Sequence, residues 1–422
     1  MKHRLLSRGE RSCCSRAGSS LEPERTKVEF HKLLAYCRRD LPNTMKLLHE
    51  AVEMESPTCS RPDIDRLARF FARAFRRHHG KVSMLDNPVT GAGLVAEFWG
   101  GSRAATPRGS KGRRETSSPQ KPILLIGHHD TVWPKGTLAR MPFRIRGGRA
   151  YGPGVLDMKS GIVLGLAAVR ALQALGVEPS SSVRFFLNPE EETGSEAFRR
   201  EIEKEARASR AVLVLEPAAE GGALKTARKG VGEFRLSVLG RSAHAGVNPG
   251  AGVNAIAELA RQVLQIEKLA EPRRGLTLNV GVIEGGTRSN VVPELARATV
   301  DVRIPRRDDQ ARIERKIFGL KSVHPEARLE IEGGINRPPM ERAMTMGLFG
   351  KAKALASQLG FEVKDAATGG GSDGNFSAAL GVPTLDGLGG VGDGAHALHE
   401  HVIIRELPRR AALLAALLAT LD

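Results

Sequence analysis

Five segments of the sequence carry imidazoles or carboxylates in an order that could hold metal ions. His128 precedes Asp130 by two residues, so that Asp130 can orient the His128 ring by hydrogen bonding. Further along lie Asp157, the acidic run at 190–192, Glu216 and finally His396 on a glycine-rich stretch. Two histidines with several carboxylates suit zinc, with cobalt or manganese as substitutes.

Each of these residues also has a purely structural explanation. A solvated loop accounts for His128, and an N-cap of the following helix accounts for Asp157. The run at 190–192 reads equally as a solvated acidic turn, because adjacent carboxylates repel unless solvent or a cation compensates. The metal hypothesis therefore depends on whether the fold brings these residues together.

The apolar pattern predicts elements that would do so. Buried strands are expected at 123–127, 183–187 and 211–215, with helices at 159–175 and 195–207 between them. This alternation predicts an α/β fold with an open, mostly parallel sheet. Such sheets gather their ligands at the carboxyl ends of the strands, where the candidate residues lie.

The pattern changes in the middle of the chain. A smaller α+β unit is expected there, with strands at 233–239, 276–282 and 297–304 and helices near 251–269 and 306–318. The α/β alternation then resumes, with elements near 343–359, 362–365 and 406–421. We therefore expect one domain inserted into another.

Composition limits the class of protein. The 422 residues are 41% hydrophobic and 26% charged, which is typical of a globular chain of two or three domains, and no apolar run could span a bilayer. Much of the net charge of +17 lies in residues 1–33 and 101–121, which read as solvated tail and loop without interleaved aromatics. We expect no nucleic-acid and no membrane partner.

Compartment signals are few. The first 20 residues lack the apolar core of a signal peptide. The cysteines form no C-x-x-C pair and predict neither a zinc knuckle nor a disulfide framework; they are Cys13, Cys14, Cys37 and Cys59. We expect a cytoplasmic protein.

From about Leu34 to the end, the chain resembles the co-catalytic zinc metallopeptidase family of glutamate carboxypeptidase, aminoacylase, acetylornithine deacetylase and succinyl-diaminopimelate desuccinylase, above all its glutamate carboxypeptidase branch. The shared motifs, in order, are His-x-Asp, Gly-x-Gly-x-x-Asp-x-Lys, Glu-Glu, a later acid and a C-terminal histidine. The resemblance implies a mostly parallel-sheet catalytic domain with an inserted α+β lid or dimerisation domain. The predicted boundaries are a disordered basic tail at 1–33, a catalytic domain at 34–228 and 338–422, and a lid at 229–337.

The resemblance also implies two zinc ions per subunit, bridged by Asp157. One ion would bind His128 and Glu216, and the other Glu192 and His396. Such ions share a hydroxide whose pKa they lower towards neutrality.

Two further residues take catalytic roles by the same resemblance. Glu191 would be the general base, and Asp130 would hold His128. The chain departs from the family pattern at His129, which is usually a small or apolar residue, and at His399 and His401, which could compete as ligands.

The resemblance assigns lid residues to the substrate. His244, in the sequence Ser-Ala-His-Ala-Gly, would enter a site, usually the neighbouring subunit's, and polarise the scissile carbonyl. Asn290 and Arg303 would hold the substrate carboxylate, Gly371 would lie in a substrate-facing glycine loop, and Arg337 is a weaker carboxylate candidate. An exposed loop histidine and a structural ion pair are the alternatives for His244 and Arg303. Lid closure near residues 229 and 337 would complete the site.

We therefore predict a two-zinc hydrolase that cleaves an amide or peptide bond next to a free carboxylate. Its substrate would be a small molecule or short peptide, and it would act as a homodimer. An N-acyl-amino-acid deacylase or a dipeptidase of the same family shares this machinery. A non-catalytic protein or a basic nucleic-acid-binding protein is the alternative of a different class.

Overall fold

The computed structural model describes residues 29–58, 60–100 and 120–421. Most of the predicted basic tail and nearly all of the 101–120 loop lie outside these residues, as do Cys13, Cys14 and Cys59. Cys37 is buried and free. Helix α1 (Phe30–Arg39) already includes residues 30–33, because Leu33 packs into the core, so the predicted start of the folded domain at 34 was too late.

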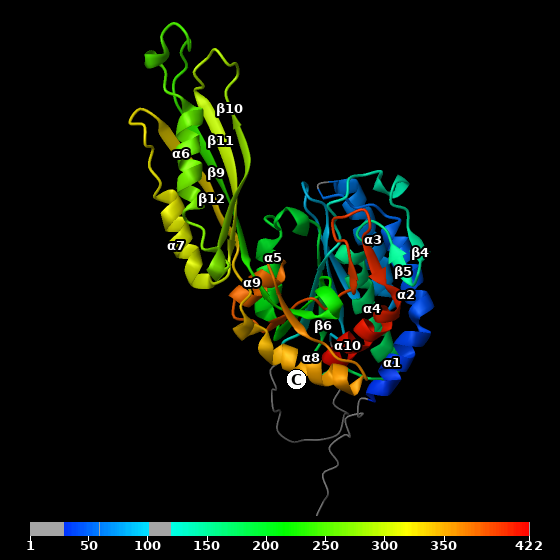
Figure 1. The fold of residues 1–422 in the computed structure, drawn as a ribbon. Coiled ribbons are helices and arrows are strands. Elements are labelled where there is room, and N and C mark those ends of the chain that lie inside the picture. The colour runs from blue at the N-terminus through cyan, green and yellow to red at the C-terminus, as the bar shows by residue number, and fades with distance from the viewer. Residues whose placement is uncertain (1–28, 59, 101–119, 422) are drawn as a thin grey trace, which may run out of the picture.

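A six-stranded sheet forms the centre of the larger domain (Figure 1). Its strand order is β1-β2-β6-β3-β7-β14. The predicted parallel strands are present as β3 (Ile123–His128), β6 (Val183–Asn188) and β7 (Ala211–Val214). β14 (Thr384–Leu385) joins them in parallel, while β2 (Gly93–Phe98) and β1 (Lys81–Leu85) form an antiparallel edge.

Both faces of this sheet are covered, which explains the continuous apolar runs of its strands. In β3, Ile123 and Leu125 belong to the core on one face, and Leu124 and Ile126 to the core on the other. The first face carries α1, α2 (Leu41–Val52), α3 (Arg61–Arg77), α4 (Ser160–Ala174), α8 (Met346–Gln358) and α10 (Leu407–Thr420). The second carries α5 (Arg199–Ala208) and α9 (Gly374–Ala379).

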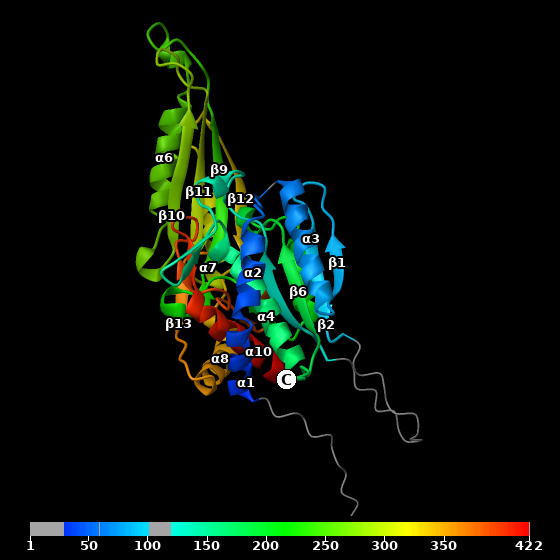
Figure 2. The ribbon, with the colours of Figure 1, turned by 90° about the vertical axis from the view of Figure 1, so that its right-hand side faces the viewer.

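The inserted unit is an antiparallel sheet that projects away from the larger domain (Figures 1 and 2). Its strands are β9 (Gly230–Leu239), β10 (Thr277–Gly285), β11 (Leu295–Ile304) and β12 (Arg328–Arg337), in the order β10-β11-β9-β12. Burial alternates along β9 and β11, because one face packs against α6 (Ala255–Glu267) and α7 (Arg307–Phe318). The chain enters this unit at β9 and leaves it at β12; we call it the lid.

Two small sheets hold loops of the larger domain in position, including those around Asp157 and His396. β5 (Arg149–Tyr151) lies between β4 (Arg144–Arg146) and β16 (His401–Ile403), and β15 (Gly392–Asp393) pairs with β16. β8 (Leu224–Arg228) pairs with β13 (Asp365–Thr368). The first of these sheets brings the segment before Asp157 beside the segments that flank His396.

Several expected elements differ in extent; the helix expected near 251–269, for example, is α6, which begins at Ala255. The helix expected at 195–207 begins at Arg199, because Ser195 adopts a left-handed backbone conformation and its hydroxyl donates to Asp373. The strand expected at 362–365 is β13, which begins only at residue 365. In the described part of the chain, no helix combines the length and apolar character needed to cross a membrane.

Gly161→Ala tests the close approach of α4 to the end of β7. Gly161 lies in the first turn of α4, and a methyl group there would overlap the carbonyl oxygen of Leu215. We expect a loss of about 1–3 kcal/mol in the free energy of unfolding, because α4 must move away from the sheet. Gly347→Ala, in the first turn of α8, is the control, since its added methyl would meet no atom within 4 Å. Equal melting temperatures for the two variants would contradict this account.

Candidate metal centre

The candidate ligands meet at the carboxyl edge of the parallel strands. His128 ends β3, Glu192 follows β6, and Glu216 follows β7. Asp157 lies before α4, whose N-cap residue is Lys159 and not Asp157. The purely structural explanation of Asp157 as an N-cap is therefore wrong.

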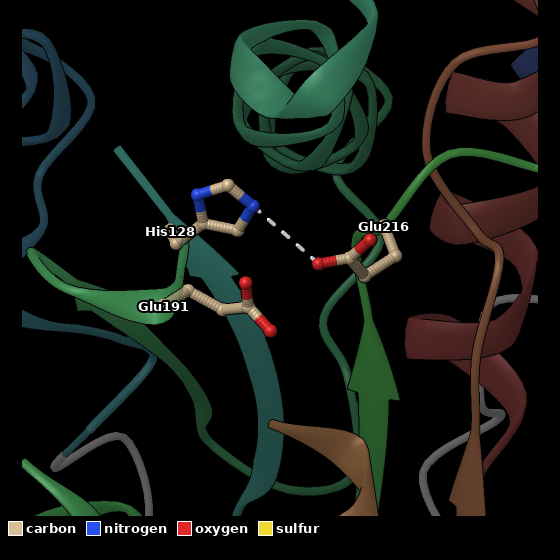
Figure 3. Close-up of side chains that lie close together, drawn as sticks. All are labelled: His128, Glu191 and Glu216. Carbon is tan, nitrogen blue, oxygen red and sulfur yellow. Dashed lines mark ion pairs between the residues drawn. The ribbon is translucent and has the colours of Figure 1, made fainter. Parts of the chain in front are cut away.

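His128 lies at the centre of a first group of ligands. Its Nε2 atom is 3.2 Å from Asp157 Oδ1 and 3.5 Å from Glu216 Oε1. Figure 3 shows the His128 ring and the Glu216 carboxylate facing each other, with the Glu191 carboxylate beside them. Potential ligand atoms of His128, Glu191 and Glu216 lie within 4.8 Å of one another, as do those of His128, Asp157 and Glu192.

His396 forms a second group with the same aspartate. Its Nε2 atom is 3.5 Å from Asp157 Oδ2 and 3.3 Å from Glu192 Oε2. Each oxygen of Asp157 therefore faces a different imidazole, with His128 on one side and His396 on the other. This is the arrangement that a carboxylate shared by two cations requires.

The donor set fits metal ions. Glu192 Oε1 is buried and has no hydrogen-bond partner among the described residues. A buried carboxylate oxygen without a partner is unfavourable unless a cation binds there. Imidazole nitrogen with carboxylate oxygen suits zinc, and also cobalt or manganese.

Without metal, protons occupy the imidazoles. Burial alone would lower the pKa of His128, but hydrogen bonds to three carboxylates raise it well above its ordinary value. Hydrogen bonds to Asp157 and Glu192 raise the pKa of His396 to about 10. Burial raises the pKa of Asp157, and the two imidazoles more than reverse this effect, so that its pKa lies below the usual range. Metal binding must therefore displace protons from both rings.

Asp130 connects two of the ligand-bearing loops. Its Oδ1 atom is 3.2 Å from His128 Nδ1, which leaves Nε2 of that ring for a metal. Its two oxygens also accept hydrogen bonds from the backbone amides of Glu191 and Glu192, each at 3.2 Å, and Thr58 Oγ1 donates to it at 2.9 Å. Asp130 is fully buried, so these bonds fix the ends of β3 and β6 relative to each other.

Glu191 is held by an arginine rather than by solvent. Arg337 Nη2 lies 3.0 Å from Glu191 Oε1 and 3.0 Å from Asp373 Oδ1, and it donates to Ser195 Oγ. Burial raises the pKa of Glu191 well above its ordinary value, and the positive charge of Arg337 offsets only part of that rise. Arg337 was expected to contact a substrate carboxylate; here it is paired with two carboxylates of the chain itself, and Gly371 packs closely against its side chain.

The lid residues that were expected to bind substrate lie at two opposite ends of the lid. Arg303 lies near the start of β9, where its guanidinium forms a bidentate pair with Asp301 and Nη1 lies 3.5 Å from the Gly369 carbonyl oxygen. Asn290 lies beyond the far end, where its carbonyl oxygen accepts from the Ala245 amide. Asn290 and Arg303 of one subunit therefore cannot bind the same carboxylate, because the ten residues of β9 separate these ends by roughly 30 Å. The ion pair considered for Arg303 is present.

His244 lies beside Asn290 at the far end of the lid. It forms an antiparallel bridge with Val291, and its ring is exposed. The backbone amides of Gly246 and Val247 donate to Nδ1, so that Nε2 carries the hydrogen of the neutral ring and can donate. The tip loops 240–254 and 286–294 project away from the larger domain of their own subunit (Figures 1 and 2).

The other histidines near the motifs belong to neither ligand group among the described residues. His129 is fully buried, and burial lowers its pKa to about 4, so it is a neutral core residue. The ring of His401 lies 5.2 Å from that of Tyr151, and its Nδ1 lies 2.9 Å from the His399 carbonyl oxygen.

Sequence reasoning missed Arg228, which lies next to the candidate ligand Glu216. Its guanidinium is bidentate to Asp386, donates to the carbonyls of Gly370 and Gly371, and lies 3.5 Å from Glu216 Oε2. All partners of this guanidinium except Glu216 lie more than 140 residues away in the sequence. Only its position one residue before the predicted lid boundary hinted at a role.

Comparison with known proteins gives a family match. Residues 124–420 match the model of peptidase family M20/M25/M40. Carboxypeptidase G2 of Pseudomonas sp. (strain RS-16) is 30% identical over 422 residues, which cover 96% of this chain and 94% of the relative. Succinyl-diaminopimelate desuccinylase 2 of Shewanella loihica is 27% identical over 319 residues, which cover 70% and 84%.

Solved structures share the fold. Aminopeptidase PepT from Bacillus cereus has a TM-score of 0.72 at 20% identity and covers 90% of this chain and 98% of its own. The YXEP protein of Bacillus subtilis, described as a dinuclear metal-binding peptidase of family M20, has a TM-score of 0.62 at 15% identity and covers 91% and 98%.

Metal removal should make stability depend on pH through His396. Its pKa of about 10 in the folded, metal-free protein exceeds the value of about 6.5 in an unfolded chain. The stability that its ion pairs contribute is therefore complete below about pH 6.5 and is lost as the pH rises towards 10. We expect the melting temperature in EDTA to fall between pH 7 and pH 10 by about 2 °C more in wild type than in His396→Gln, since a half-exposed pair contributes about 1 kcal/mol or less. Parallel curves for the two proteins would contradict this.

Proposed function

From its membership of peptidase family M20/M25/M40, which makes the chain a metallopeptidase, we propose a more specific activity. The protein is a two-zinc carboxypeptidase that acts on an amide or peptide bond next to a free carboxylate. The observation that carries the proposal is the position of Asp157, whose two oxygens face His128 and His396. In this proposal His128, Asp157 and Glu216 hold one ion, and Asp157, Glu192 and His396 hold the other. When bound, the ions would polarise the scissile carbonyl and lower the pKa of a water.

Glu191 is the proposed general base. Its carboxylate lies beside the proposed ligands His128 and Glu216, and burial raises its pKa well above its ordinary value, which favours its acceptance of a proton. It would take the proton of the attacking water and deliver it to the leaving amine. Arg337 would keep the Glu191 carboxylate facing the site through the 3.0 Å ion pair.

Two further groups of the proposed site would come from a second subunit. His244 and Asn290 lie together at the lid tip, away from the metal centre of their own chain. In a homodimer, His244 Nε2 of one subunit would donate to the carbonyl oxygen of a substrate bound at the other. Arg303, at the opposite end of the lid, would act in its own subunit through Nη1, which faces the glycine loop.

A substrate panel tests the proposal. The panel contains folyl-glutamate, N-acetyl and N-succinyl amino acids, and dipeptides, each with the zinc-loaded protein. We expect folyl-glutamate to be cleaved, and its α-amide analogue to show a kcat/KM lower by at least about 100-fold, because the site must then leave a carboxylate-binding group unpaired. Preference for an N-acyl amino acid or a dipeptide would instead assign one of the alternative activities of the family.

Glu191→Gln is the control that ties turnover to this site. We expect kcat to fall by about 10²–10⁴-fold with the metal content unchanged, since the amide cannot accept the proton. Glu196→Gln, an exposed glutamate on the same loop, should keep full activity. Substantial turnover by Glu191→Gln would reject the assigned base.

Mixed dimers test the role of the lid. His244→Ala should lower kcat while metal content stays the same. The His244→Ala and Glu191→Gln chains are unfolded, mixed and refolded, so that about half of the dimers contain one chain of each kind. If each site takes His244 from the partner chain, one of the two sites in every mixed dimer has both groups. About a quarter of wild-type activity should then return. No recovery despite heterodimer formation, measured with differently tagged chains, would place His244 in its own subunit's site or outside catalysis.

A further inference from the structure

A buried carboxylate outside the proposed ligand set joins three of the segments that carry it. Glu400 is fully buried and accepts four hydrogen bonds. Its Oε1 atom accepts from the amides of Leu156 at 2.8 Å and Asp157 at 3.0 Å. Its Oε2 atom accepts from the Gly154 amide at 3.0 Å and from Trp133 Nε1 at 2.8 Å.

These donors come from different parts of the site. Trp133 follows Asp130 by three residues, and the three amides belong to the loop that presents Asp157. Glu400 itself follows His396 by four residues, and the turn between them is closed by backbone hydrogen bonds from Ala397 to Gly394 and from Glu400 to Ala397. One side chain therefore connects the loops of His128, Asp157 and His396.

The loop of Asp157 needs such an acceptor. Gly154 has a left-handed backbone, and Asp157 and Met158 are not helical, so regular secondary structure does not satisfy the amides at 154, 156 and 157. An ionised carboxylate accepts from four donors at once and forms stronger, charge-assisted hydrogen bonds. A glutamine would turn its NH₂ group towards at least one of these donors.

We propose that Glu400 is a positioning residue, which sets the distance between Asp157 and His396 by anchoring the Asp157 loop to the turn that carries His396. The inference rests on the proposed function, because it assigns Asp157, Glu192 and His396 to one metal ion. Glu400 belongs to neither group of candidate ligands among the described residues. It acts through the backbone of Asp157.

The lid supplies a matched control. Glu258 in α6 is also fully buried and also accepts four hydrogen bonds, from the amides of Val323 and His324 and from Gln262 and Arg261. It contacts none of the ligand-bearing loops. Glu258→Gln therefore introduces the same chemical change in a comparable setting without disturbing the proposed site.

The experiment measures metal binding by metal-free protein, with Zn²⁺ in competition with a chromophoric chelator and with Co²⁺ followed by its absorption spectrum. We expect Glu400→Gln to lower the affinity for the second of the two Zn²⁺ ions by roughly 10–100-fold. The absorption spectrum recorded as the second equivalent of Co²⁺ binds should also change. Glu258→Gln should keep both affinities, even where its melting temperature falls. Trp133→Phe removes one of the four donors and keeps the carboxylate, so it should lower the affinity for the second Zn²⁺ ion by a smaller factor.

Three results would overturn the inference. The first is a folded Glu400→Gln with both wild-type affinities, and the second is an equal weakening in Glu258→Gln. The third applies if Glu400→Gln does not fold: unchanged affinities in Trp133→Phe would then show that Glu400 serves stability alone. If the wild-type protein itself fails to bind two ions, the proposed function fails as well. The three results above are distinguished from this one because the wild-type protein binds two ions in each of them.

Discussion

The whole site depends on holding carboxylates close together at one edge of a sheet. Like charges repel more strongly as water is excluded, so this arrangement is unfavourable unless positive charge lies among them. The chain provides two imidazoles and the guanidinium groups of Arg228 and Arg337. The carboxylates concerned are Asp130, Asp157, Glu191, Glu192 and Glu216.

Each positive group is shared by more than one carboxylate. His128 lies within 3.5 Å of Asp130, Asp157 and Glu216. Arg337 pairs with Glu191 and Asp373, and Arg228 contacts Glu216 and Asp386. Removing any one cation leaves several buried anions uncompensated, so the effects of substitutions within this cluster are not additive. The candidate ligands, Glu191 and the two arginines form one electrostatic unit.

The parts that the sequence predicts are those with a local signal. Continuous apolar runs locate β3, β6 and β7 to within a residue, because strands buried on both faces have no polar alternation. His128, Asp157, Glu192 and Glu216 were found because each lies at the end of such a strand or before the helix after it, whereas His396 was found on a glycine-rich stretch. Arg228 and Glu400 have no local signal, since their roles arise from partners far away in the sequence. The separation of Asn290 from Arg303 follows from the length of β9, which motif matching does not consider.

The described part of the chain passes between the larger domain and the lid at two places, and both are anchored in the charged cluster. At the first crossing, Arg228 contacts Glu216 two residues before β9 begins; at the second, Arg337, the last residue of β12, is paired with Glu191. A rotation of the lid would therefore move the carboxylates of Glu216 and Glu191, which lie beside the His128 ring. By reciprocity, an ion bound at the candidate metal centre would bias the angle of the lid, so that occupancy and domain orientation would be thermodynamically linked.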